Sequence, residues 1–230
     1  MIKWGVLGTG SIANIFIESL KVSKESELFG IASRSDKRAK EFSSLHDCLG
    51  FTEYDELIKQ KDINAIYIAT PHTSHFNLTF QSLMRGKPVL CEKPLATNSS
   101  EVMILIDLAR KKNLLLMEAL MYRMHAQTDM IKEIVITEFL NKEVLIEASF
   151  GFEANVNNNH RLLNPELGGG SILDVGCYPM SMSRMLIGLI NGKSFSDPVE
   201  FEVKSELNKE NIDLYSEAVL AFEGNCSAKI

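Results

Sequence analysis

Short apolar runs alternate with helix-like segments along the first half of the chain. The strand-like runs cover residues 2–7, 28–32, 65–69, 88–91 and 114–117. The segments between them that have helical character cover residues 11–22, 36–45, 75–85 and 101–112. Such alternation predicts an α/β fold, a doubly wound parallel sheet with helices on both faces. We place this first domain at residues 1–122.

The pattern changes in the second half, which we assign to a second domain at residues 123–230. Longer strand-like runs cover residues 144–152, 199–207 and 214–222, and one helical stretch covers residues 172–190. They predict an α+β domain with an open sheet and helices on one face. Gly224 and Asn225 predict a hairpin turn, after which residues 226–230 leave room for one short strand. We therefore expect this sheet to be incomplete.

Composition and charge narrow the classes of function. The 230 residues carry a net charge of -6 without a basic stripe, so we expect no nucleic-acid partner. The N-terminus lacks the apolar segment of a signal peptide, and no run reaches the ~18 apolar residues of a membrane helix. The four cysteines form no C-x-x-C pair, which favours buried thiols in a reducing compartment. We expect a cytoplasmic protein without a bound metal.

A glycine motif follows the first predicted strand and opens the first helix. It fits G-x-G-x-x-G/A, the pattern typical of dinucleotide binding in that context. Gly8 would permit a tight turn, Gly10 would let a pyrophosphate approach the backbone, and Ala13 would allow close helix packing. The alternative is a plain glycine turn. The predicted cofactor-binding residues of this motif are Gly8, Thr9, Gly10, Ser11, Ile12 and Ala13.

The end of the second predicted strand indicates which dinucleotide is bound. A site for NAD usually has an acidic residue there, to hold the ribose 2′-hydroxyl. This chain has Ser33 and Arg34 at the strand end, and Arg38 nearby. Hydroxyl and guanidinium groups suit a 2′-phosphate, so the sequence favours NADP, with NAD as the alternative. The simpler interpretation is a solvated basic start of a helix.

The end of the next predicted strand carries polar residues. Thr70, Pro71, His72 and His75 follow the strand at residues 65–69. In a parallel sheet this end lies on the same edge as the glycine motif, where such folds bind ligands. We predict that all four contact the cofactor. His75 could instead cap the next helix, and His72 could simply be exposed.

Glu92, Lys93 and Pro94 close the strand at residues 88–91, on the same edge. Lys93 is predicted to point toward the nicotinamide end of the crevice and to hydrogen-bond a substrate hydroxyl, stabilising the alkoxide as hydride leaves. Glu92 would orient or tune the ammonium group. We therefore count Glu92 and Lys93 among the cofactor-binding residues, and Lys93 also as catalytic. A surface lysine is the alternative.

The second half supplies a candidate acid/base. Asp174 and Tyr178 are spaced i, i+4 after Gly168, Gly169 and Gly170, so they share one helix face. A tyrosine held near a lysine and an aspartate can exchange the hydroxyl proton during oxidation. The alternative is a helix packed through its glycines, with Tyr178 half-buried in the core.

These segments together resemble the glucose-fructose oxidoreductase / inositol dehydrogenase (Gfo/Idh/MocA) family. The matching pieces are GVLGTGSIA at 5–13, ATPHTSH at 69–75, GKPVLCEKPLA at 86–96 and GGGSILDVGCY at 168–178. The segments at 117–127, 149–152 and 161–170 are most similar to the branch of NADP-dependent xylose dehydrogenases and trans-dihydrodiol dehydrogenases. The family often has asparagine where this chain has His72.

The resemblance implies a Rossmann domain followed by a domain with an open, mostly antiparallel sheet. It also implies NADP-linked oxidation of a hydroxyl on a sugar or cyclic diol, with Lys93, Asp174 and Tyr178 in the catalytic roles. Relatives have more strands in the second sheet and dimerise through it, so we expect a truncated chain and a homodimer.

Two functions remain open at this point. The first is an NADP-dependent dehydrogenase acting on a sugar or similar polyol. The second is a catalytically silent NADP-binding protein, such as a truncated relative or a redox-sensing partner. We expect substrate choice to come from loops around Arg123 and residues 155–161.

Overall fold

The computed structural model describes residues 1–157 and 160–230. Asn158 and Asn159, part of the loop predicted to govern substrate choice, lie outside the described residues. Contacts divide the chain into two compact units, Met1–Ala119 and Leu120–Ile230. Each unit has its own sheet and its own apolar core.

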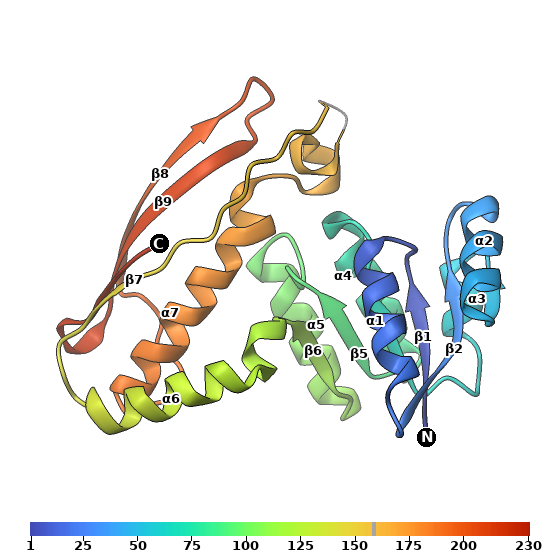
Figure 1. Cartoon of the computed structure of the whole chain (residues 1–230), viewed down its shortest axis with the longest axis horizontal. Coiled ribbons are helices and arrows are strands. Elements are labelled where there is room, and N and C mark those ends of the chain that lie inside the picture. The colour runs from blue at the N-terminus through green and yellow to red at the C-terminus, as the bar shows by residue number, and fades with distance from the viewer. Residues whose placement is uncertain (158–159) are drawn as a thin grey trace. The chain divides into compact units, whose positions relative to one another are not determined.

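The first unit holds a six-stranded sheet in the order β3-β2-β1-β4-β5-β6, in which every neighbouring pair is parallel (Figure 1). The strands are β1 Ile2–Leu7, β2 Ser26–Ala32, β3 Leu49–Phe51, β4 Ala65–Ile68, β5 Val89–Glu92 and β6 Leu116–Ala119. The helices are α1 Ser11–Lys21, α2 Asp36–His46, α3 Tyr54–Ile58, α4 His75–Met84 and α5 Ser99–Lys112. The predicted doubly wound sheet is therefore confirmed.

The strands of this sheet are buried on both faces. Val6 belongs to one apolar cluster with residues of α1 and α2, whereas its neighbour Leu7 belongs to another with residues of α3, α4 and α5. Successive strand residues point to opposite faces. Helices therefore cover both faces, which explains why the strands read as continuous apolar runs rather than alternating ones.

The strand order reverses next to β1, whose two neighbours are β2 and β4. In doubly wound sheets, ligands bind outside the carboxyl ends of the strands at such a reversal. The glycine motif follows β1 directly, so it lies at this position. β3 and α3 were not predicted, because runs of three and five residues are too short for a periodic pattern.

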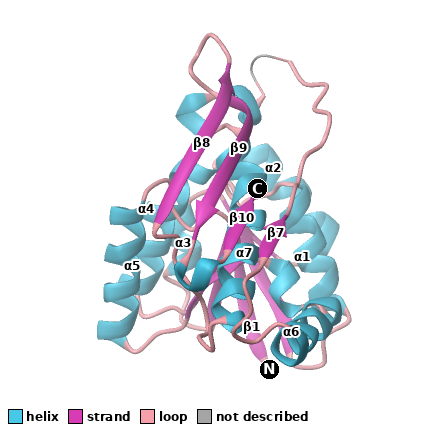
Figure 2. Ribbon diagram, turned by 90° about the vertical axis from the view of Figure 1, so that its left-hand side faces the viewer, coloured by secondary structure: helices cyan, strands magenta, loops and turns pink. Residues whose placement is uncertain are grey.

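The second unit contains a four-stranded sheet in the order β7-β10-β9-β8 (Figure 2). Its strands are β7 Leu145–Glu147, β8 Glu200–Leu207, β9 Asp213–Ala221 and β10 Ser227–Lys229. The pairs β8–β9 and β9–β10 are antiparallel and β7–β10 is parallel, so the expected mostly antiparallel sheet is confirmed. Helix α7, Cys177–Ile190, packs on it through Ile187 and Ile190.

Three predictions for this unit need correction. The predicted strand at 144–152 is wrong beyond Glu147, where β7 ends, because only β10 pairs with it and β10 is three residues long. Helix α6, Ala126–Glu138, was missed because its apolar residues are mostly exposed and give a weak pattern. The single helix predicted at 172–190 begins as a π-helix, Ile172–Gly176, before α7.

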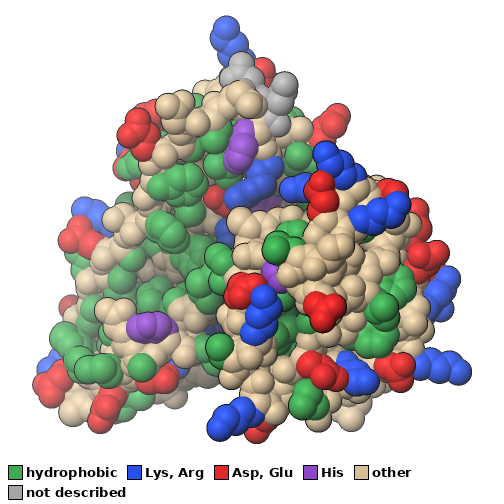
Figure 3. Space-filling model, turned by 45° about the vertical axis from the view of Figure 1, so that its right-hand side comes forward, with side chains coloured by type: hydrophobic (Ala, Val, Ile, Leu, Met, Phe, Trp, Pro, Cys, Tyr) green, Lys and Arg blue, Asp and Glu red, His purple; other side chains and the backbone are tan. Residues whose placement is uncertain are grey.

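Charge is spread over the surface without a large area of one sign on the face that Figure 3 shows, where acidic and basic side chains are interspersed. Of the helices in the described part of the chain, none is long and apolar enough to cross a membrane.

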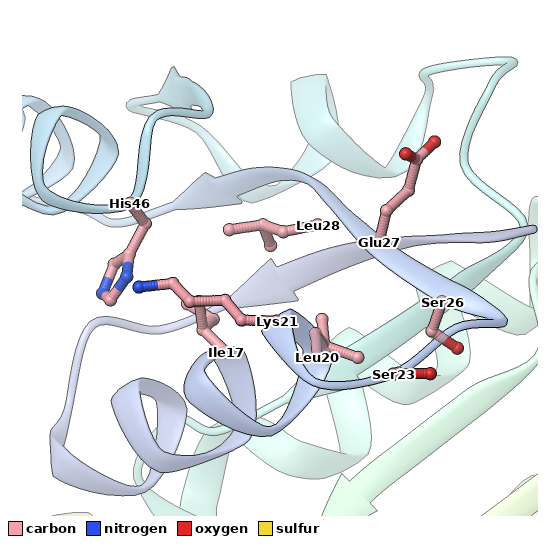
Figure 4. A pocket seen from close by; sticks show the side chains of 8 residues that line it. All are labelled: Ile17, Leu20, Lys21, Ser23, Ser26, Glu27, Leu28 and His46. Carbon is pink, nitrogen blue, oxygen red and sulfur yellow. The ribbon is translucent and has the colours of Figure 1, made fainter.

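A small cavity lies at the far end of the first unit from the glycine motif. Its volume is about 280 Å³, and it is lined by the last turn of α1, the start of β2 and His46 at the end of α2 (Figure 4). The His46 side chain is 1% exposed, and among the described residues neither ring nitrogen has a hydrogen-bond partner. Burial, and then the nearby Lys21 ammonium, lower the pKa of His46, although Glu18 opposes the shift.

This histidine predicts a loss of stability in mild acid. Because its pKa is lower in the folded protein than the ~6.5 of a free histidine, protonation favours the unfolded chain. The free energy of unfolding should therefore decline as pH falls below about 6.5. We expect His46→Leu to reduce this decline, measured by urea unfolding between pH 7.5 and 5. Met103→Leu, at an exposed position of α5 that carries no titratable group, should keep the wild-type pH dependence. If the unfolding free energy of His46→Leu declined with pH as steeply as that of wild type, His46 would not be the cause of the decline.

Candidate active site

Most of the predicted cofactor residues of the first unit lie at one edge of its sheet, where β1, β2, β4 and β5 end. The glycine motif follows β1, Ser33 and Arg34 follow β2, Thr70 and Pro71 follow β4, and Lys93 follows β5. Because all the strands are parallel, their carboxyl ends meet at this edge. His75, Arg38 and the motif's last residues begin the helices that leave it.

Gly8 and Gly10 differ in what makes glycine necessary. Gly8 has φ +112°, and a Cβ there would lie 2.3 Å from the carbonyl oxygen of Ala69. The fold itself therefore requires glycine at position 8. At Gly10 a Cβ would meet nothing within 4 Å. Packing within the described protein gives no reason for this second glycine, whereas a ligand lying against the backbone there would give one.

The start of α1 is arranged to receive an anion. Gly10 is its N-cap, and in the described structure this cap has no side-chain hydrogen bond and the first turn has no acidic residue. The positive end of the helix dipole and its unpaired N–H groups therefore face the open space in front of Gly10. Ala13 is fully buried, so the helix lies close to the sheet. Thr9, Ser11 and Ile12 complete this turn, and the residues present fit a pyrophosphate.

The end of β2 is linked to the glycine motif by hydroxyl groups. Thr9 Oγ1 donates a hydrogen bond to Ser33 Oγ over 3.3 Å, and the Ser35 backbone N–H also donates to Ser33 Oγ over 3.4 Å. Ser35 Oγ in turn accepts from the Arg38 backbone N–H and caps α2. Ser33 is buried, whereas the Arg34 and Arg38 side chains are exposed at the edge.

The carboxylate nearest in the sequence to this strand end is already engaged. Asp36 Oδ2 pairs with Lys40 Nζ at 2.8 Å, one turn further along α2. Ser33 and Arg34, which follow β2 directly, contribute no carboxylate to the strand end. The groups that β2 presents at the edge are thus hydroxyls and guanidinium groups, which suit a phosphate better than a ribose diol.

His75 joins the ends of β4 and β5. It is fully buried, with Nδ1 2.7 Å from the Pro94 carbonyl oxygen and Nε2 2.8 Å from the Thr70 carbonyl oxygen. The ring of His72, also buried, lies with its centroid 5.8 Å from that of His75. Pro71 leads into the short helix that contains His72. Carbonyl oxygens only accept, so at least one ring nitrogen of His75 donates to the backbone, and the ring lies against both strand ends.

Lys93 is the residue between Cys91 and Ala96 that is not buried. On one side of it, Glu92 is buried and its Oε1 accepts a 2.6 Å hydrogen bond from the Tyr67 hydroxyl. On the other side, the peptide bond to Pro94 is cis. Lys93 is therefore the partly exposed residue of an otherwise buried strand end.

Glu118, near the end of β6, is a site residue that the sequence did not reveal. Its Oε1 accepts a 2.8 Å hydrogen bond from the backbone N–H of Leu95, which holds the segment just after Lys93. Burial, with the nearby charges of Glu92 and Glu118, raises the pKa of the Cys91 thiol. Both carboxylates therefore lie close to the end of β5. A single glutamate after an apolar run of leucines and one methionine gives no signal for this contact.

The second unit holds the remaining two predicted residues. Asp174 lies in the π-helix, is 5% exposed, and its Oδ1 accepts a 3.1 Å hydrogen bond from Arg161 Nη1. Tyr178 lies in the first turn of α7, with its ring 5.3 Å from that of Phe150 and 6.3 Å from that of Tyr122. π-helical turns occur often at functional sites, and the widened turn here contains Asp174.

The start of this helix is fixed by Asp213. Its Oδ2 accepts hydrogen bonds from the Ile172 backbone N–H at 2.6 Å and from Ser171 Oγ at 2.8 Å. Gly170, at φ +116°, leaves room for that carboxylate, since a Cβ there would lie 2.1 Å from Asp213 Oδ1. Further along, Ser181 Oγ accepts from the Tyr122 hydroxyl and Arg123 Nη2, each at 2.9 Å. Arg123, predicted as a substrate determinant, is therefore attached to α7.

The described residues contain no group of three or more histidine, cysteine, aspartate and glutamate side chains that could hold a metal ion. At the glycine motif, in contrast, the open space at Gly10 and the uncapped start of α1 fit the pyrophosphate of a dinucleotide.

Comparison with known proteins agrees with this geometry. The model of the oxidoreductase family with an NAD-binding Rossmann fold matches residues 2–120. Trans-1,2-dihydrobenzene-1,2-diol dehydrogenase from Xenopus laevis is 33% identical over 229 residues, which is 98% of this chain and 67% of that protein. D-xylose 1-dehydrogenase (NADP(+)) from Hypocrea jecorina is 32% identical over 201 residues, 78% of this chain and 51% of that protein.

A solved structure extends the likeness to both units. KijD10, a 3-ketoreductase from Actinomadura kijaniata in complex with NADP and TDP-benzene, has a TM-score of 0.86 and is 26% identical. The match covers 99% of this chain and 67–68% of the KijD10 chains compared. The chain thus spans about two thirds of the length of the Xenopus laevis protein and of KijD10, and about half of that of the xylose dehydrogenase.

The two glycines give opposite predictions. Gly8→Ala should lower the free energy of unfolding by about 2 kcal/mol or more. The positive φ and the close contact with Ala69 would both strain the new alanine. Gly10→Ala should cost about 1 kcal/mol or less, since its Cβ meets open space and only the cap is altered. Gly10→Ala should nevertheless weaken the binding of a dinucleotide, because the added methyl group would occupy the space in front of the helix start. Urea unfolding and titration calorimetry with NADP measure the two effects; unchanged affinity in Gly10→Ala would show that no dinucleotide lies there.

Proposed function

Since the chain belongs to the oxidoreductase family with an NAD-binding Rossmann fold, we propose that it transfers hydride between a CH–OH group of a sugar or cyclic polyol and NADP. The observation that carries this proposal is the position of Lys93. It is partly exposed at the end of β5, on the sheet edge that also carries the glycine motif. Dehydrogenases for xylose and for a dihydrodiol are among the similar proteins, which supports the substrate class.

The choice of NADP rests on the end of β2. Ser33, Arg34 and Arg38 would hold the 2′-phosphate, and Arg is suited to it by its planar paired donors. The xylose dehydrogenase that resembles this chain is named for NADP(+), and KijD10 was solved with NADP. Gly8, Thr9, Gly10, Ser11, Ile12 and Ala13 would hold the pyrophosphate, and Thr70, Pro71, His72 and Glu92 would adjoin the nicotinamide side.

The proposed chemistry divides between charge stabilisation and proton transfer. When bound, the nicotinamide supplies the acceptor for hydride. The Lys93 ammonium would hydrogen-bond the substrate oxygen and stabilise the negative charge that develops there as the C–H bond breaks. The Tyr178 phenol would take the hydroxyl proton in oxidation and return it in reduction. Asp174, held by Arg161, would orient this exchange.

Substitution of Lys93 tests the catalytic role. Lys93→Met should lower kcat by about 100-fold or more while NADP still binds, because the methionine keeps the length but lacks the charge. Turnover is followed by NADPH absorbance with a panel of aldoses and cyclic diols, alongside Tyr178→Phe. Lys111→Met, at an exposed position of α5, is the matched control and should retain wild-type turnover.

Two results would count against this proposal. If Lys93→Met turns over at the wild-type rate, Lys93 has no catalytic role. If the wild-type protein binds NADP but oxidises or reduces nothing in the panel, the silent NADP-binding protein becomes the better description.

Substitution of Arg34 tests the cofactor. Arg34→Ala should raise the Kd for NADP about tenfold, because a charge-assisted hydrogen bond contributes about 1.5–3 kcal/mol, and leave the Kd for NAD within about twofold. Titration calorimetry with both dinucleotides gives the ratio. Arg110→Ala on α5, also exposed, controls for loss of a surface charge. Equal weakening of NADP and NAD would remove Arg34 from 2′-phosphate recognition.

A further inference from the structure

A buried tyrosine on β4 holds a buried carboxylate at the end of β5. The Tyr67 hydroxyl donates a 2.6 Å hydrogen bond to Glu92 Oε1, and the two residues are 2% and 9% exposed. Strands β4 and β5 are parallel neighbours, with Tyr67 opposite Leu90. Glu92 lies two residues beyond Leu90, so its side chain is on the same face of the sheet as the Tyr67 ring. The phenol and the carboxylate therefore meet on one face, next to the carboxyl edge of the sheet.

That face is the one covered by α1. Tyr67 belongs to the apolar cluster that contains Ala13 and Ile17 of this helix, and its ring is stacked on that of Phe16, with the centroids 3.9 Å apart. The Tyr67 ring is thus fixed by packing, while its hydroxyl is directed at Glu92. Glu92 and the helix that starts at the proposed pyrophosphate site consequently lie on the same face of the sheet.

The hydrogen bond matters because a buried carboxylate is costly unless it has a partner. The phenol supplies a donor without a positive charge of its own, so it holds the carboxylate in place and leaves its negative charge intact. Without this donor Glu92 would turn toward solvent or take up a proton, because burial disfavours the charged form. In either case the end of β5 would lose a negative charge at a fixed position.

A fixed negative charge here would distinguish the two redox states of the cofactor. The nicotinamide ring of NADP⁺ is a cation, whereas the ring of NADPH is neutral. A carboxylate beside the ring attracts the first and not the second, and this attraction is strong where water is excluded. Glu92 immediately precedes Lys93, the residue proposed to bind the substrate oxygen, so the ring would lie near it.

We propose that Tyr67 is a positioning residue that fixes the Glu92 carboxylate, and that Glu92 held in this way favours binding of the oxidised dinucleotide over the reduced one. This inference rests on the proposed function and adds how the site would choose between redox states. Tyr67 touches no ligand in this role, so its contribution should depend on Glu92. The nearby Lys93 ammonium acts in the opposite sense, and the informative quantity is therefore the change on substitution of Glu92 or Tyr67.

The test is the Kd for NADPH divided by the Kd for NADP⁺, measured by titration calorimetry in the absence of substrate. Wild type, Tyr67→Phe, Glu92→Gln and the double variant of the full chain are compared. Glu92→Gln should lower this ratio ~3- to 10-fold by weakening NADP⁺, and leave the Kd for NADPH within about twofold. Tyr67→Phe should lower the ratio in the same direction, by ~2- to 5-fold. In the Glu92→Gln background, Tyr67→Phe should change the ratio no further.

Both substitutions keep the local packing. Phenylalanine retains the ring that is stacked on Phe16, and glutamine retains an oxygen that can accept from the Tyr67 hydroxyl. A second tyrosine–glutamate pair provides the matched control. The Tyr215 hydroxyl donates to Glu217 Oε2 over 3.4 Å, at an exposed position on β9 of the other unit. Tyr215→Phe and Glu217→Gln should both keep the wild-type ratio.

The possible failures point to different errors. Wild type that binds neither NADP⁺ nor NADPH would overturn the proposed function and this inference with it. An unchanged ratio in Glu92→Gln would show that the carboxylate does not lie beside the ring, and would overturn the inference while the proposed function stands. An unchanged ratio in Tyr67→Phe, or equal weakening of both forms, would overturn the role of Tyr67, since the hydroxyl would then serve only the fold.

Discussion

The close approach of Gly8 to the backbone of Ala69 is the constraint on which the dinucleotide edge depends. No side chain fits between the turn after β1 and the end of β4, because a Cβ on Gly8 would overlap the Ala69 carbonyl. Since glycine occupies this position, the chain can turn at once into α1, whose buried Ala13 keeps the helix close to the sheet. The open space in front of Gly10 follows from that turn, and with it the anion site at the helix start.

Much of this first unit could be predicted from the sequence, because its determinants are local. Strands covered on both faces give unbroken apolar runs, and the glycine motif identifies the turn and the helix that follows it. That the strand ends share one edge of the sheet then follows from their parallel direction. Ser33 and Arg34 could be placed beside the motif before any contact was known, since both follow a strand in a sheet with one carboxyl edge.

What could not be predicted is held by contacts between distant segments. Glu118 carries no motif; it matters because a neighbouring strand end places the backbone N–H of Leu95 within its reach. In the second unit β7 stops early because its partner β10 is short, and a single-strand pattern contains no information about its partner's length. The π-helix at Asp174 likewise arises where Asp213, far along the chain, fixes the helix start.

The two sets of proposed catalytic residues are supported in different ways. Around Lys93 the neighbours are held through backbone atoms: His75 bonds the Pro94 carbonyl, and Glu118 bonds the Leu95 N–H. Asp174 is instead held through its own carboxylate, by Arg161, which is itself half-exposed. A group fixed by its backbone keeps its place when its side chain is exchanged, whereas a side-chain ion pair is lost with either partner. Substitution at Lys93 therefore leaves these two backbone contacts in place, while substitution at Asp174 removes its ion pair with Arg161 and changes chemistry and local structure together.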